Sequence, residues 1–150
     1  MFAGKCINYL ETYADELPEK LLTKIARAGK CSELFSRVPR KEQQQAIRDI
    51  YQHMTEWLLN QDRPVPEEYY VSIGMRRAAQ GVPFTDLLHA VCAAREYFWE
   101  FVEQETLLDQ PTDFWGGIRL LRSLDRWFDT ILGFAAAGYY KQQMDAVRHT

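Results

Sequence analysis

The sequence contains little cysteine, and its cysteines are not arranged for covalent or metal cross-links. Only three of the 150 residues are cysteine, namely Cys6, Cys31 and Cys92. An odd number at wide separations matches neither a disulfide framework nor the Cys-x-x-Cys spacing of zinc sites. Free thiols of this kind are typical of a reducing compartment, so we predict a cytoplasmic protein.

Long apolar runs and an excess of one charge are also missing. The longest nearly apolar run, Ile131 to Tyr140, has ten residues and contains Gly133 and Gly138, whereas a membrane helix needs roughly 20. The N-terminus lacks the cationic and apolar segments of a secretory signal. The 18 basic and 21 acidic residues leave a net charge of −3, which argues against a broad nucleic-acid surface. We therefore expect no membrane anchor and no nucleic-acid partner.

Catalytic and ligand-binding signatures are absent as well. The sequence has no Gly-x-Ser-x-Gly elbow, no phosphate-binding loop, no His-Glu-x-x-His pair and no Glu-x-x-His pair of the di-iron kind. A haem ligand would have to be a histidine that faces inward. On a helical wheel His89 lies opposite the apolar side chains, His53 lies at the border of an apolar arc, and His149 is in the terminal turn. The sequence predicts solvated histidines, no cofactor, no metal site and no enzyme activity.

The pattern that is present is helical periodicity. Glycine and proline total 14 residues and fall mostly where helices should start or stop. Tyr69 to Ile73 is rich in β-favouring residues, but a strand there would have no partner. The run Gln43 to Gln45 is predicted to lie on a solvated helix face. Apolar residues recur at helical spacing over residues 5–14, 16–28, 40–61, 67–80, 83–105 and from about 112 to the chain end. We predict an all-α fold, a single bundle of about five to six helices over residues 1–150 with a long C-terminal helix.

Three charged residues fall on apolar helix faces. Arg77 lies between Tyr70 and Ile73 on the wheel, Arg95 lies in the middle of an apolar stripe, and Asp125 lies on the inner face of the last helix. Because a lone buried charge is costly, these groups need partners. One hypothesis is an Arg95–Asp125 salt bridge between the two long helices. The other is a polar pocket in which Arg77 and Arg95 hold a small anionic ligand such as a carboxylate or phosphate.

The last helix also has a wider apolar face than one core requires. Leu120, Trp127 and Phe134 recur every seven residues beside its main apolar stripe. This flank is a candidate surface for a homodimer or another partner. The alternative is that the other helices of the bundle wrap around it.

One segment carries a resemblance to a known family. From Gly74 the sequence is Gly-Met-Arg-Arg-Ala-Ala-Gln-Gly-Val-Pro-Phe-Thr-Asp-Leu-Leu-His-Ala, and Arg95-Glu96-Tyr97-Phe98-Trp99 follows. This resembles the N-terminal domain of RsbRD-type RsbT co-antagonist proteins, in which a Gly-x-x-Arg-Ala-x-x-Gly-Val-Pro segment precedes a Leu-Leu-x-Ala helix. The match is sharpest from Gly74 to Trp99, and helix order and lengths agree over most of the chain.

The resemblance implies an all-helical signal-input module of a bacterial regulator whose output is a STAS domain, a histidine kinase or a helix-turn-helix segment. Related stressosome proteins carry a globin-like domain without haem, so a globin-like outline is an expectation too. No recognisable output domain precedes Thr150. Two hypotheses follow. One is a non-enzymatic sensory domain that acts through ligand- or partner-induced change at its long C-terminal helix, and the alternative is a stand-alone small-molecule or haem-binding protein.

Overall fold

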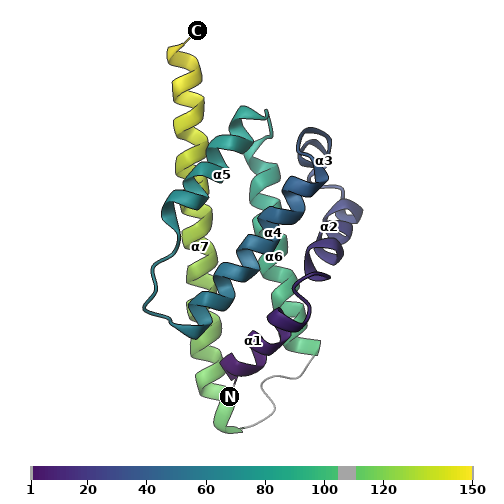
Figure 1. Ribbon diagram of the computed structural model, residues 1–150, viewed down its shortest axis with the longest axis vertical. Helices are drawn as coiled ribbons and strands as arrows, with labels where there is room; N and C mark the ends of the chain where they lie inside the picture. The colour runs from purple at the N-terminus through teal and green to yellow at the C-terminus, as the bar shows by residue number, and fades with distance from the viewer. Residues whose placement is uncertain (1, 105–110, 150) are drawn as a thin grey trace.

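A computed structural model describes residues 2–104 and 111–149, and within these ranges the regular structure is helical. The all-α bundle with a long last helix is confirmed (Figure 1). The helices are α1 (Phe2–Thr12), α2 (Leu17–Ala28), α3 (Ser32–Arg37), α4 (Arg40–Leu59), α5 (Glu67–Ala79), α6 (Phe84–Gln104) and α7 (Pro111–Arg148).

Helix α3 was not predicted, because six residues are too few to display a 3.6-residue period. Tertiary contacts hold it instead. The backbone N–H of Leu34 donates to the Asp86 carboxylate of α6 over 3.0 Å, which satisfies one of the donors that a helix N-terminus leaves unpaired. Asp86 is buried and lies 52 positions further along the chain than Leu34. Because the hydrogen bond that stabilises α3 is this distant in sequence, the local sequence does not predict the helix.

Helix α5 was correctly predicted as a helix despite its β-favouring residues, and it crosses α7 at very short range (Figure 1). A Cβ atom built on Gly74 of α5 would lie 1.9 Å from the carbonyl oxygen of Ala135. A Cβ built on Gly138 of α7 would lie 1.9 Å from the carbonyl oxygen of Val71. The two glycines therefore let the helix backbones touch, and any larger residue at either position would push them apart.

Helix α7 is the longest element, with 38 residues, or about 57 Å at 1.5 Å per residue. Its inner face fills the core with residues that include Leu124, Phe128 and Ile131. Its C-terminal end projects beyond the other helices (Figure 1). Toward this end Tyr140, whose ring packs against Phe84 of α6, and Met144 are more than half exposed.

Hydropathy gives no candidate membrane span. Across residues 2–104 and 111–149, no helix is both long enough and apolar enough to cross a bilayer.

Candidate functional site

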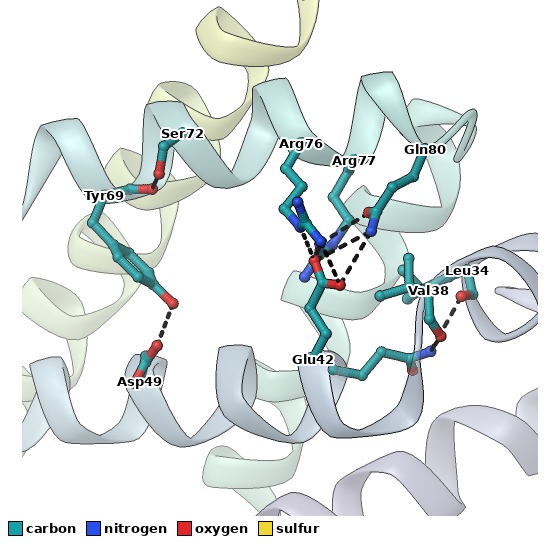
Figure 2. A network of polar contacts seen from close by, with 10 residues as sticks. Leu34, Val38, Glu42, Asp49, Tyr69, Ser72, Arg76, Arg77 and Gln80 are labelled. Atoms are coloured by element: carbon teal, nitrogen blue, oxygen red, sulfur yellow. Dashed lines mark hydrogen bonds and ion pairs between the residues drawn. The ribbon is translucent and has the colours of Figure 1, made fainter.

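The most highly connected polar group in the fold is centred on Glu42 of α4 (Figure 2). Its carboxylate accepts hydrogen bonds from Arg76, Arg77 and Gln80, all on or next to the last turn of α5. The bond from Arg77 Nη1 is 2.8 Å long, and the same nitrogen donates to Gln80 Oε1 over 3.1 Å. Arg77 is an inward-facing charge, with a side chain only 3% exposed. This network joins the start of α4 to the end of α5.

The electrostatics of the network favour an ionised Glu42. Hydrogen bonds from Arg76 and then Arg77 lower the pKa of the Glu42 carboxyl from its ordinary value of 4.5 to about 2, although partial burial opposes them. Arg76 is 60% exposed and Arg77 is almost fully covered. Glu42 therefore neutralises a buried guanidinium that would otherwise lie in the protein without a counter-charge.

The expected Arg95–Asp125 salt bridge was wrong. Arg95 Nη1 donates to Asp129 over 3.2 Å, one helical turn further along α7. Asp125 accepts instead from the indole N–H of Trp99 over 3.0 Å. The wheel placed Arg95 in mid-stripe, but its side chain is 28% exposed and Asp129 is 67% exposed, because a long arginine side chain can carry its charge to the surface from an inner position.

The two arginines of the anion-pocket hypothesis are turned toward different partners. Arg77 contacts Glu42 of α4 and Arg95 contacts Asp129 of α7. A pocket in which both hold one anion is not formed by this arrangement, since each guanidinium is directed to a carboxylate of the protein.

The flank of α7 proposed as a partner surface lies mostly inside the bundle. Leu120 is 8% exposed, Trp127 is 3% exposed, and Phe134 is partly buried against the core. The other helices thus wrap around α7 here, which is the alternative that the sequence left open. The exposed large apolar side chains of α7 lie toward its two ends, with Trp115 near the start and Tyr140, Met144 and Val147 near the C-terminal end.

The three histidines differ in their exposure to solvent. His89 and His149 are exposed, as predicted. The prediction of a solvated His53 was wrong, because its Nδ1 lies 2.7 Å from the hydroxyl of Tyr70 and its ring packs edge-on to Tyr69 and Tyr70. Burial lowers the pKa of His53. In the part of the chain that the structure describes, no three His, Cys, Asp or Glu side chains gather as a metal site would require.

A cavity of about 70 Å³ lies beside the Glu42 network. Helices α2 to α7 all line it, and its wall is apolar apart from Gln43, Arg77 and two tyrosine rings. Gln43 is 4% exposed, so its assignment to a solvated face was wrong. Neither Gln43 nor Glu42 was predicted as a site residue, since both lie in a polar stretch whose local pattern is typical of a solvent-exposed helix face.

Comparison with known proteins identifies the family. The profile of the RsbT co-antagonist protein rsbRD N-terminal domain matches residues 14–150. The chain belongs to this family. Its members are regulatory signalling domains of stress-response proteins. No curated protein and no solved structure matches the chain, so the globin-like outline stays a prediction.

The segment that carries the RsbRD resemblance forms the α5–α6 corner, and its characteristic residues have identifiable structural roles. Gly74 permits the contact with α7, and Arg77 forms the buried pair with Glu42. Gly81 has a φ of 76°, a left-handed conformation that favours glycine. Trp99 reaches Asp125 on α7. The RsbRD motif thus specifies how α5 and α6 are fixed to α4 and α7.

Proposed function

We propose that this chain is a non-enzymatic input domain of a cytoplasmic bacterial signalling protein. A bound ligand or protein partner would change the bundle, and α7 would carry that change to an output domain of the STAS, histidine kinase or helix-turn-helix type. The output domain would lie in the same polypeptide or in a partner. Family membership supports the regulatory role. The observation that carries the mechanism is the geometry of α7, which is packed against α5 around Ala135 and Gly138 and projects beyond the bundle at its C-terminal end (Figure 1).

A continuous helix is a suitable element for such transmission. Because α7 is helical from Pro111 to Arg148, a displacement or rotation at the α5 crossing moves its far end as well. The contact at Gly74 and Gly138 is backbone to backbone, so α5 cannot shift toward α7 without moving it.

We propose that α7 also forms a homodimer through its exposed face from Gly133 to its C-terminal end. Its exposed face carries Gly133, Ala137, Tyr140, Met144 and Val147. These positions alternate in steps of four and three, the spacing that lets two like helices pack along one seam. Gly133 has nothing within 4 Å of the place a Cβ would occupy, so a second helix has room to approach there. This face replaces the buried Leu120 and Trp127 as the proposed contact.

The dimer is tested by sedimentation equilibrium of the purified chain. Tyr140→Ser combined with Met144→Ser should lower the association constant at least about ten-fold, because two apolar side chains would no longer be covered. Leu59→Ser is the matched control, since Leu59 is 66% exposed on α4 and away from this face. A monomeric parent protein, or an equal effect of Leu59→Ser, would contradict the homodimer.

The output contact is tested with a STAS-domain protein of the stress-signalling type. Hydrogen exchange of residues 140–149 should slow when that protein is added to the parent chain. Unchanged exchange along the whole of α7 would count against transmission through this helix.

The haem-binding alternative receives little support from the histidines. His89 and His149 are exposed, and Nδ1 of His53 is engaged with Tyr70. We expect no Soret band in the visible spectrum of the purified protein. A Soret band in the parent protein that is lost with His53→Ala would instead support haem binding through His53.

A further inference from the structure

The cavity of about 70 Å³ beside the Glu42 network is lined almost entirely by carbon atoms. Branched aliphatic side chains from three long helices form part of its wall, among them Ile47 of α4, Val91 of α6 and Ile131 of α7. Almost no polar atom surface faces the space. A buried water makes about three hydrogen bonds to the groups around it, so we expect this cavity to be dry.

Two polar side chains of the wall, Arg77 and Gln43, offer no substantial hydrogen-bonding surface to an occupant. Nη1 of Arg77 donates to Glu42 and to Gln80, and the charge of the guanidinium is balanced by Glu42. Its other N–H groups present little to the space, because almost none of the wall is polar. Gln43 donates its amide nitrogen to two backbone carbonyls, and its Oε1 is covered by protein atoms. Both residues therefore contribute chiefly carbon surface.

The two tyrosines of the wall likewise turn their hydroxyls to protein partners. Tyr69 donates to Asp49 (Figure 2), and the hydroxyl of Tyr70 pairs with Nδ1 of His53. What they add to the cavity is aromatic carbon. A molecule with a hydroxyl, amide or charged group would give up its hydrogen bonds to water here and gain none in return. The wall thus selects for molecules that have no such group.

The volume limits how large an occupant can be. An apolar cavity of about 150 Å³ in another protein stays dry and holds benzene. The cavity here is about half that size, which suits roughly three or four carbon atoms. Wall atoms that face empty space lack van der Waals partners, and an apolar molecule of this size would supply them.

We propose that this cavity binds a small apolar molecule without hydrogen-bonding groups, of the class of short alkanes, short alkenes and dissolved apolar gases. Ala135 of α7 lines the cavity, and its carbonyl oxygen is the atom that Gly74 of α5 approaches most closely. The occupant therefore touches the residue at which α5 meets α7. A regulatory meaning of such a ligand rests on the proposed function, whereas its binding does not.

The test compares propane with ethanol, which have the same number of non-hydrogen atoms but differ in polarity. Amide and methyl shifts of the purified chain are followed by NMR during titration with each compound. Propane should shift the residues that line the cavity. Ethanol should bind at least about ten-fold more weakly, because its hydroxyl would be buried without a partner. Equal affinity for the two compounds, or no shift with propane, would refute the proposal.

Location is tested by filling the cavity. Ala90→Val and Ala94→Val each add two carbon atoms to the wall on α6, and each should abolish propane binding in a protein that circular dichroism shows to be folded. Ala79→Val is the matched control, since Ala79 is exposed on α5 and does not line the cavity. Binding that survives both filling variants, or is lost equally with Ala79→Val, would overturn this location.

Coupling to α7 is measured separately, as hydrogen exchange of residues 140–149 with and without propane. A change in exchange that disappears with Ala94→Val would support a regulatory role for the occupant. Bound propane with unchanged exchange would confirm the site and contradict that role. Absence of binding would refute the site and leave the experiment with the STAS-domain protein standing, so the two proposals fail separately.

Discussion

The buried pair of Arg77 and Glu42 predicts an asymmetry between its two single substitutions. Glu42→Gln leaves the guanidinium of Arg77, 3% exposed, without a counter-charge. Arg77→Met leaves Glu42, which is 21% exposed, with Arg76 and Gln80 still donating to it. Removing the carboxylate should therefore destabilise the protein more than removing the buried arginine, because only the first change leaves an uncompensated buried charge.

The magnitude follows from the Glu42 carboxyl. A pKa lowered from 4.5 to about 2 corresponds to about 3 kcal/mol at 1.36 kcal/mol per unit. Part of that interaction comes from the solvent-screened Arg76. We expect Glu42→Gln to cost about 2–3 kcal/mol, Arg77→Met about 1–2 kcal/mol, and the exposed control Arg76→Ala at most about 1 kcal/mol.

The assay is urea unfolding followed by tryptophan fluorescence, at about pH 7 and about pH 3. Because the folded pKa of Glu42 lies below the unfolded value, its contribution is complete above 4.5 and is lost as the pH falls toward 2. The difference between parent and Glu42→Gln should shrink accordingly at about pH 3. A larger loss for Arg77→Met than for Glu42→Gln, or a difference independent of pH, would refute the reasoning.

Three further predictions concern packing, a surface pair and a histidine. Gly74→Ala should destabilise the fold by about 2 kcal/mol or more, because its Cβ would lie 1.9 Å from a carbonyl oxygen of α7. By contrast Gly116→Ala, with open space around its Cβ, should stabilise α7 by about 0.5–1 kcal/mol in thermal unfolding. Arg95→Ala should cost at most about 1 kcal/mol in urea, since its partner is 67% exposed; a cost near 4 kcal/mol would indicate a buried pair. His53 should titrate by NMR below 6.5 because burial lowers its pKa. Its contribution to stability is therefore present above 6.5 and lost at lower pH, and a midpoint above 6.5 would contradict its burial.

The helices that the sequence predicted well are those long enough to repeat an apolar pattern. Helices α4, α6 and α7 each span 20 residues or more, so the apolar residues of their inner faces repeat often enough to predict both the helix and its buried side. Helix α3 is not, because its stability depends on Asp86, which is distant in the chain.

The polar contacts were predictable only in part. A helical-wheel projection correctly predicts that Arg77 faces inward. It does not predict which acidic residue of another helix pairs with Arg77, nor that the Arg95 side chain reaches the protein surface. The burial of Gln43 is the clearest example of a contact that the local sequence pattern does not predict. Its buried amide nitrogen donates to two backbone carbonyls, one in α3 and one directly after it. Helix α3 itself is not predicted by the local sequence pattern.

The position of Gln43 and Glu42 as chain neighbours at the start of α4 has a mechanical consequence under the proposed function. Glu42 fastens α4 to the end of α5, while Gln43 faces the cavity on the adjacent side of the same turn. The contact of α5 with α7 is backbone to backbone, so under the proposed function a shift of α5 is passed to α7. A displacement of α4 would reach this pair of helices through the Glu42 network. On this argument Glu42→Gln should weaken the coupling between α4 and α7 even in variants stable enough to stay folded.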